Sequence, residues 1–291
     1  MSDKQKDSVL LVLLLVTIAC CVCSGFLYER MRRMDQRVEQ MAEKVAAKQW
    51  AERFQGSMDR LTAMRQAVED AAPESAGQES GEEIKHKVYL TFDDGPSAYT
   101  DEILDVLAKY NVKGTFFVVG KEDEASQKAL KRIVEEGHTL AMHSYSHKYS
   151  ELYETLDSFM EDFHKEQDYL EEVTGEKCKF YRFPGGSSNT VSQQDMRLFA
   201  YYLDSQDVVF YDWNVDSGDA KSHHQTVEQI VENSTATINR WGTSVILMHD
   251  ALDKHTTVEA LPTVIETIQA MEDTALLPIT EDTIPVQHLH R

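Results

Sequence analysis

The chain has 291 residues, of which 42% are hydrophobic, enough for one large domain with a packed core or for two smaller domains. Its formal net charge of −21 is concentrated after residue 84, because residues 85–291 hold 18 of the 29 basic and 36 of the 50 acidic side chains, a net of −18. A domain this acidic repels nucleic acid and anionic lipid, which argues against both as ligands, and it is compatible with a neutral or cationic partner such as an amino sugar.

The first predicted element is a membrane anchor, which follows a short tail at residues 1–8. Residues 9–28 are uncharged and dominated by Val, Leu and Ile. As a helix this run would span about 30 Å, the thickness of the hydrocarbon core of a bilayer. The alternative is a cleaved signal peptide, but its apolar region is normally about 7–15 residues long, and no small-x-small cleavage site follows the run. We therefore predict an uncleaved single span.

A helical stalk and a flexible linker are predicted next. Apolar residues from Leu27 to Val45 recur at alternating spacings of four and three, and an approximate stripe continues to Val68. Such a stripe is typical of a coiled-coil seam, so residues 29–70 are predicted to be a stalk that could join two copies of the chain, although charged residues interrupt the seam. Residues 71–84 are rich in Ser, Gln, Glu and Gly, which predicts a flexible linker.

Residues 85–291 are predicted to form the catalytic domain, because β-branched or aromatic runs alternate there with amphipathic stretches. This alternation predicts parallel strands with crossover helices, in a closed or nearly closed barrel or an open doubly wound sheet. Cys178 is the only cysteine after residue 23, so the domain has no disulfide framework. The predicted strands are Lys87–Phe92, Gly114–Val119, Thr139–His143, Lys179–Arg182, Val208–Tyr211, Ser244–His249 and Leu277–Thr280. The predicted helices are Thr100–Tyr110, Glu124–Glu136, Ser150–Val173, Thr226–Arg240 and Val258–Met271.

Ionisable residues gather at the carboxyl ends of these strands. In barrels of alternating strands and helices, that face is where active sites are built, so we expect these residues to share one site. They are Asp93, Asp94, His143, Arg182, Asp212, Asp216 and His249.

Two histidines and two carboxylates predict a metal site. If residues 143–147 form a helical turn, His143 and His147 point the same way and both imidazoles can reach one cation. Two surface histidines would show the same spacing, but the adjacent carboxylates of Asp93 and Asp94 favour a metal, because one can bind the ion while the other stays free as a base. Two histidines and one carboxylate also leave room for water and substrate, as a hydrolytic metal requires.

The other strand ends indicate metal-assisted hydrolysis of an amide or an ester. Asp93 could act as the base, and His249 could give a proton to the leaving group. Arg182 could orient Asp93 through charge-assisted hydrogen bonds. Asp219 or Asp216 could pair with His249 and raise its pKa, which would keep it protonated.

Five motifs occur in an order that resembles a known family. They are Thr-Phe-Asp-Asp-Gly-Pro at 91–96, His-Ser-x-x-His at 143–147, Arg-Phe-Pro-Gly-Gly at 182–186, Asp-x-x-Asp at 216–219 and Leu-Met-His at 247–249. Together they resemble the polysaccharide deacetylases, carbohydrate esterase family 4, over about residues 85–282. The resemblance implies an α/β fold, a distorted (β/α)7 barrel, here preceded by a transmembrane helix and a helical stalk. It also implies removal of N-acetyl groups from polymers of N-acetylglucosamine.

The resemblance assigns the metal to Asp94, His143 and His147. The N,N,O ligand set makes zinc the expected ion, although cobalt or another divalent ion could serve.

The resemblance assigns the catalysis to four residues. It makes Asp93 the base and His249 the acid, with Arg182 orienting Asp93 and Asp219 tuning His249.

Four further residues are predicted to face the substrate. The backbone N–H of Gly185, after Pro184, could help to stabilise the tetrahedral oxyanion. Leu247 belongs to the fifth motif, and Trp213 could line the groove, although a single aromatic is more often a core residue. In many family members the fourth motif ends in a Trp that walls the groove, but Ala220 stands here, so either Trp213 or another aromatic covers the wall or the groove is wider.

Three functions follow from this pattern. The first is N-deacetylation of peptidoglycan or a related aminoglycan, the second O-acetyl esterase activity on acetylated xylan or another glycan, and the third metal and glycan binding by a wall protein with little turnover. Four arginines at residues 30–37 would favour a cytoplasmic side for the segment after the span. A wall glycan lies outside the membrane, however, so we predict a single-pass cell-membrane protein with an extracellular catalytic domain.

Overall fold

The computed structural model describes residues 84–221 and 225–289. The predicted anchor at 9–28, the stalk at 29–70 and nearly all of the linker lie outside these residues, as does the predicted stalk dimer. Within the described part of the chain, no helix is both long enough and apolar enough to cross a membrane.

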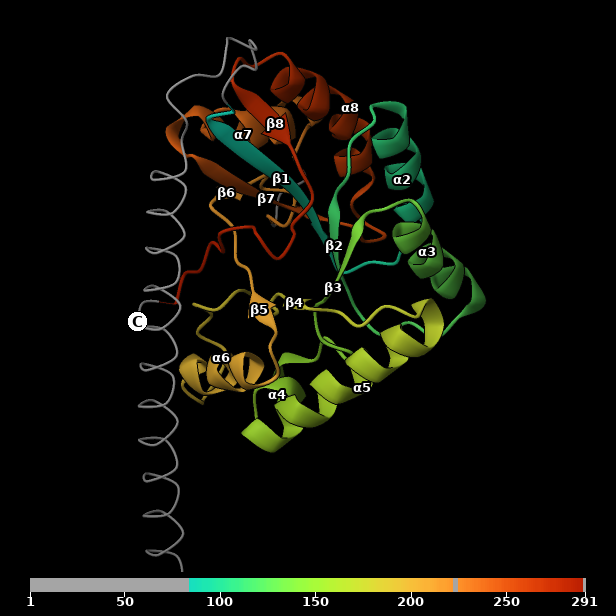
Figure 1. Ribbon diagram of the computed structural model, residues 1–291, viewed down its shortest axis with the longest axis vertical. Coiled ribbons are helices and arrows are strands. Elements are labelled where there is room, and N and C mark those ends of the chain that lie inside the picture. Colours follow the sequence, from blue (N-terminus) through green and yellow to red (C-terminus); the bar gives the residue numbers. More distant parts are fainter. Residues whose placement is uncertain (1–83, 222–224, 290–291) are drawn as a thin grey trace, which may run out of the picture. The chain divides into compact units, whose positions relative to one another are not determined.

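The described chain forms a curled parallel sheet with helices on its outer side (Figure 1). Seven strands follow the order β5-β4-β3-β2-β1-β7-β6, and β8 pairs with β1 beside β2. The strands are β1 (His86–Asp93), β2 (Thr115–Val118), β3 (Thr139–Met142), β4 (Phe180–Tyr181), β5 (Val209–Phe210), β6 (Val215–Asp216), β7 (Thr243–His249) and β8 (Thr274–Leu276). This parallel half-barrel is consistent with the expected (β/α)7 barrel, and its strand path ends at β5 and β6.

The helices mostly follow the predicted ranges. They are α2 (Thr100–Lys109), α3 (Glu124–Glu135), α4 (Tyr149–Leu152), α5 (Leu156–Thr174), α6 (Met196–Ser205), α7 (Val227–Thr235) and α8 (His255–Gln269), with a 3₁₀ turn at Ile238–Arg240. The prediction of one continuous helix at 150–173 was wrong, because the structure has two helices there, α4 and α5. Thr155 starts a new helix there, because its hydroxyl accepts a hydrogen bond from the Ser158 N–H in a capping box.

Other predictions of secondary structure were also wrong or incomplete. The last strand lies at 274–276 rather than 277–280, because the chain pairs there with the first residues of β1. The helix at 226–240 ends at residue 235 and gives way to the 3₁₀ turn. Neither α6 nor β6 was predicted, and β6 has only two residues, too few for an alternating pattern.

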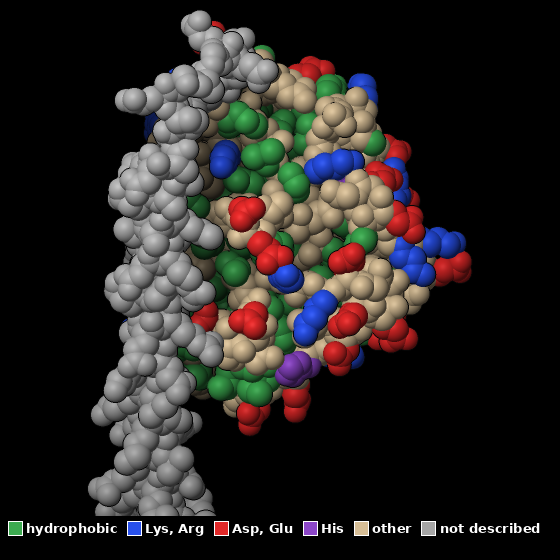
Figure 2. All heavy atoms as spheres, in the orientation of Figure 1, with side chains coloured by type: hydrophobic (Ala, Val, Ile, Leu, Met, Phe, Trp, Pro, Cys, Tyr) green, Lys and Arg blue, Asp and Glu red, His purple; other side chains and the backbone are tan. Residues whose placement is uncertain are grey.

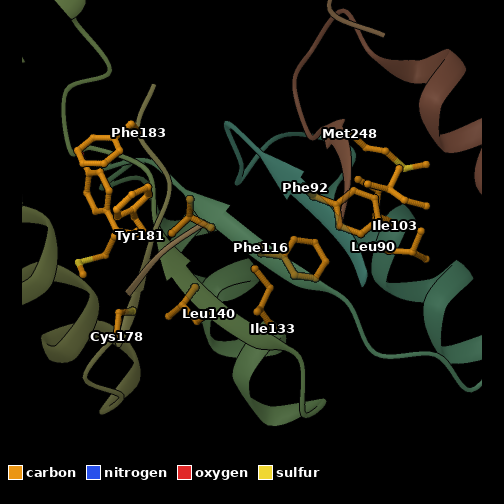
Figure 3. Close-up of a cluster of buried hydrophobic side chains, with 14 of the residues drawn as sticks. Leu90, Phe92, Ile103, Phe116, Ile133, Leu140, Cys178, Tyr181, Phe183 and Met248 are labelled. Atoms are coloured by element: carbon orange, nitrogen blue, oxygen red, sulfur yellow. The ribbon is translucent and has the colours of Figure 1, made fainter. Parts of the chain in front are cut away.

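Both faces of β2 and of the last six residues of β1 are buried, as expected from their near-continuous apolar sequences. Side chains that point outward from the sheet, such as Leu90, Phe92, Phe116 and Leu140, pack against the helices (Figure 3). The inner face carries a smaller cluster, which contains Tyr89, Phe117, Ala141, Phe180, Tyr211, Val245 and Ile279. The inner-face side chains fill the interior of the barrel, so the polar residues at the carboxyl ends of the strands lie directly above packed apolar side chains.

Candidate active site

The alternation of side chains along the strands brings the predicted residues together. Residues two apart on a strand face the same side, so Asp93 continues the inner face after Tyr89 and Thr91. His249 and Asp93 are register partners on neighbouring strands. The sequence therefore folds so that the polar ends of the inner-face rows meet at one place.

The three predicted metal ligands converge. Asp94 Oδ1 lies 3.2 Å from His147 Nε2 and 3.6 Å from His143 Nε2. Ligand atoms from all three side chains lie within 4.8 Å of one another. Asp94 Oδ1 is buried and has no hydrogen-bond partner, which is unfavourable unless a cation faces it. The residues therefore fit a divalent metal.

The imidazoles are prepared to act as ligands. His143 Nδ1 lies 2.7 Å from the Arg182 carbonyl oxygen, so Nδ1 must carry the proton and donate it, which leaves the Nε2 lone pair free for an ion. Burial, together with the neighbouring His143, lowers the pKa of His147 against the opposing effect of Asp94 and Asp93. Both effects favour the neutral imidazole that binds metal.

Residues 143–147 do not form the helical turn that would have aligned His143 and His147. The segment is an irregular loop in which Ser144 and His147 have positive φ angles of 89° and 51°. The two rings approach each other, with centroids 5.2 Å apart, because this loop folds back rather than because of helical spacing.

The Asp94 corner is held by residues that the sequence patterns did not reveal. Lys121 Nζ donates to the carbonyl oxygens of Asp94 and Pro96 at 2.9 and 2.6 Å. Asp250 lies behind the corner and accepts a hydrogen bond from Thr100 Oγ1 at 2.5 Å. A Cβ atom on Gly95 would clash with Asp250 Oδ2, so a larger residue there would require the Asp250 carboxyl group to move. Neither Lys121 nor Asp250 belongs to a short motif that chemistry alone would single out.

Arg182 holds Asp93 through a buried ion pair. Its Nη1 donates to Asp93 Oδ1 and to Thr91 Oγ1, both at 2.7 Å, and the whole side chain is buried. The guanidinium also donates to the carbonyl oxygens of Tyr211 and Asp212, and it stacks over the Phe117 ring at 4.1 Å. Arg182 therefore fixes one oxygen of Asp93 and leaves Oδ2 toward the metal ligands, 3.7 Å from His143 Nε2.

His249 is paired with Asp219, one of the two predicted carboxylates. His249 Nδ1 lies 2.8 Å from Asp219 Oδ1, and the His249 N–H donates to Asp219 Oδ2 at 2.8 Å. Burial alone would lower the pKa of His249, but the hydrogen bond and the charges of Asp219, Asp93 and Asp94 outweigh it and raise the pKa to about 9. Asp216 instead accepts a hydrogen bond from the Gly218 N–H and does not contact His249.

The predicted substrate-facing residues occupy different environments. Gly185 has a φ of 76°, and a Cβ there would lie 3.0 Å from the Tyr149 ring, while the carbonyl of Pro184 accepts a hydrogen bond from Tyr153. Leu247 is buried in β7. Trp213 is half-buried between Gly186 and His288.

The wall beside Ala220 is polar. Ala220 is exposed and lines a cavity of about 250 Å³ whose described lining contains no aromatic residue. The lining residues are Asp219, Ala220, Lys221, Gln225, Ile230, Asp253, Lys254, Thr256 and Thr257. Trp213 lies beside Gly186 instead and does not contribute to the described lining of this cavity.

The C-terminal segment supports the site from a second direction. Asp212 accepts hydrogen bonds from the Ser187 and His288 N–H groups at 2.7 and 2.6 Å, and Leu289 N–H donates to Ser187 Oγ at 2.9 Å. Val286 accepts from the Asp212 N–H. These contacts tie residues 286–289 to the loop that carries Gly185, and no sequence pattern indicated them.

Comparisons with known proteins identify the family of the chain. Residues 80–203 match the polysaccharide deacetylase family model. The chain is 34% identical to YheN of Bacillus subtilis (strain 168) over 209 residues, 67% of this chain and 70% of that protein. It is 30% identical to a peptidoglycan-N-acetylglucosamine deacetylase of Bacillus cereus (strain ATCC 14579) over 186 residues, 61% of this chain and 64% of that protein.

A solved structure shows the same fold. The catalytic domain of the peptidoglycan N-acetylglucosamine deacetylase from Eubacterium rectale ATCC 33656 superposes with a TM-score of 0.66 at 36% identity, over 76% of this chain and 98% of that one. The residues matched by the family model include the motifs at 91–96, 143–147 and 182–186, and they end before Asp219 and His249. The chain therefore belongs to the polysaccharide deacetylase family, carbohydrate esterase family 4.

Proposed function

We propose that this protein is a metal-dependent hydrolase that removes N-acetyl groups from an extracellular polysaccharide containing N-acetylglucosamine, such as peptidoglycan. The observation that carries the proposal is the convergence of Asp94, His143 and His147 beside a separate base–acid pair, Asp93 and His249. Relatives named as peptidoglycan-N-acetylglucosamine deacetylases support the choice of substrate.

Asp94, His143 and His147 would hold the metal, and zinc is the proposed ion because two imidazoles and one carboxylate suit it. The chemistry supplied by such an ion is Lewis acidity, which polarises the acetyl carbonyl and lowers the pKa of water.

Asp93 is the proposed base. Arg182 binds Oδ1, so Oδ2 can take the proton from the water that attacks the acetyl carbon. The backbone N–H of Gly185 is a proposed donor to the oxyanion that forms on the carbonyl oxygen, since the positive φ of Gly185 turns the chain sharply there.

His249 is the proposed acid. Asp219 holds Nδ1, which leaves the Nε2–H to protonate the sugar amine as the C–N bond breaks. With a pKa raised to about 9, His249 is protonated at neutral pH and can perform this step. The products are acetate and a glucosamine unit, whose positive charge suits an acidic domain.

The location and partners are part of the proposal. Because a wall polysaccharide lies outside the cell, the catalytic domain is proposed to be extracellular and attached to the membrane through residues 9–28. The stalk at 29–70 is the segment proposed to join two copies of the chain. On the face shown in Figure 2, acidic and basic side chains of the described residues are interspersed, which supports a partner other than nucleic acid.

The direct test is acetate release by the purified full-length chain from a panel of glycans, with and without a chelator. We expect chelator-sensitive release from N-acetylglucosamine oligomers or peptidoglycan. Release from acetylated xylan alone would favour an O-acetyl esterase, for which the polar recess beside Ala220 is the supporting feature. Metal and glycan binding without any acetate release would favour a wall-binding protein.

A further inference from the structure

Helix α5 presents two carboxylates to the loop that carries the histidines. Glu166 accepts hydrogen bonds from the backbone N–H groups of His143 and Ser144, at 3.0 and 2.8 Å. Asp162 accepts from the next two, those of Tyr145 and Ser146, at 2.8 and 2.9 Å. Two side chains one helical turn apart therefore hold four consecutive backbone donors.

The loop needs such support because its backbone is unusual. Ser144 and His147 both have positive φ angles, which are disfavoured for residues with a Cβ atom. In loops that include left-handed residues, successive N–H groups can turn to one side and form a concave site for an anion. Here the acceptors are the carboxyl groups of Glu166 and Asp162, so the conformation that places both imidazoles depends on them.

The support is rigid. The helix begins with the Thr155 capping box and ends at Gly175, and it packs into the core through Phe159, Phe163 and Leu170. Figure 1 shows α5 as one long straight helix that follows α4. Glu166 is itself fully buried, and among the described residues no cation pairs with it. A carboxyl group is expensive to bury unless hydrogen bonds satisfy its oxygen atoms, so the two backbone donors account for the presence of Glu166 in the core.

We propose that Glu166 and Asp162 are positioning residues of the metal site. By holding the four N–H groups of residues 143–146, they fix the loop so that His143 and His147 present Nε2 to Asp94. The pair touches neither substrate nor ion, and its effect is on metal affinity. This inference rests on the proposed metal-dependent function.

The test is a competition titration of the metal-free full-length chain with Zn²⁺, comparing Glu166→Gln and Asp162→Asn with the unaltered protein. Each amide keeps the size of the side chain but replaces one acceptor oxygen with an NH₂ group that faces a backbone donor. We expect about 10–100-fold weaker binding, as for other groups that orient metal ligands, and a larger loss for Glu166→Gln because it contacts His143 directly. Glu172→Gln, on an exposed part of the same helix, is the matched control and should bind like the unaltered protein.

Two further readouts separate positioning from simple stability. The d–d absorption bands of the Co²⁺-loaded variants should shift, because the ligand geometry changes, and the thermal midpoint of each metal-free variant shows whether it is folded. If Glu166→Gln does not fold, the half-buried Asp162→Asn decides the question. Unchanged affinity and spectrum in a folded variant, beside normal binding by the unaltered chain, would overturn the inference alone. Absence of metal binding by the unaltered chain would overturn the proposed function as well.

Discussion

Asp93 and His249 are register partners on β1 and β7, and each has an ion-pair partner of its own. Arg182 lies 2.7 Å from Asp93, and Asp219 lies 2.8 Å from His249. One partner is a cation and the other an anion, so Asp93 accepts a hydrogen bond from Arg182 whereas His249 Nδ1 faces a carboxylate oxygen of Asp219. The proposed base and the proposed acid are therefore each held by a partner of opposite charge.

The Asp93→Asn variant tests the base. Asparagine retains an oxygen for Arg182 but cannot accept the proton of water, so kcat should fall about 10²–10⁴-fold. Metal content, measured by mass spectrometry of the purified protein, should not change, because Asp93 is not among the proposed ligands. Retention of full activity, or loss of the metal, would show that the roles of Asp93 and Asp94 are assigned incorrectly.

The pH dependence tests the acid. His249 must be protonated to act, and its pKa is raised to about 9, so kcat should be sustained through neutral pH and decline as the pH rises through about 9. Asp219→Asn removes the main contribution that raises this pKa and leaves the opposing effect of burial. The decline should then move to lower pH in a profile of acetate release. If the decline of kcat at high pH occurs at the same pH in the unaltered protein and in Asp219→Asn, His249 is not the acid.

Arg182→Met tests how much the buried ion pair between Arg182 and Asp93 contributes to the free energy of unfolding. Methionine has a similar length but leaves Asp93 buried without its partner, which should cost about 3–5 kcal/mol of unfolding free energy in urea denaturation. The double variant Arg182→Met with Asp93→Asn should recover part of that loss, because the uncompensated charge is gone. Equal losses for the single and double variants would contradict an electrostatic role.

The sequence predicted the strand ends better than the contacts between them. Asp93 and His249 could be placed because each ends an apolar strand, and the alternation of side chains decides the face to which each belongs. The fold class was predictable for the same reason, since strands and helices alternate along the chain.

What the sequence could not reveal lies in hydrogen bonds between distant segments. Lys121 donates to the backbone carbonyl of Asp94, and Asp250 accepts from the Thr100 hydroxyl. Contacts of this kind between distant segments produce no recognisable spacing of residues in the sequence. A helical turn at 143–147 was considered from the spacing of the two histidines, but the N–H groups of residues 143–146 instead donate to the carboxyl groups of two α5 residues. Tertiary contacts override local preference where a site needs an unusual backbone.

Removal of residues 286–291 tests the support from the C-terminal segment. The truncation deletes the N–H donors of His288 and Leu289 to Asp212 and Ser187, so the loop that carries Gly185 loses contacts on one side. We expect a lower thermal midpoint and a KM raised several-fold, with unchanged Zn²⁺ affinity, because no proposed metal ligand depends on these contacts. A loss of Zn²⁺ affinity would contradict this prediction, because it would show that the segment supports the metal-binding residues rather than the loop that carries Gly185.

Ala220→Trp tests whether the open wall decides substrate choice. An indole at this exposed position would cover the polar recess of about 250 Å³ and offer a flat apolar face to a sugar ring. An aromatic contact adds about 0.5–1.5 kcal/mol, so KM for N-acetylglucosamine oligomers should fall about 2–10-fold at constant kcat. Ala220→Leu adds bulk without a flat face and should leave KM nearly unchanged. If the Trp variant instead loses activity on its best glycan, the recess itself accommodates part of the natural polymer, and a substrate wider than an unbranched N-acetylglucosamine chain is the better assignment.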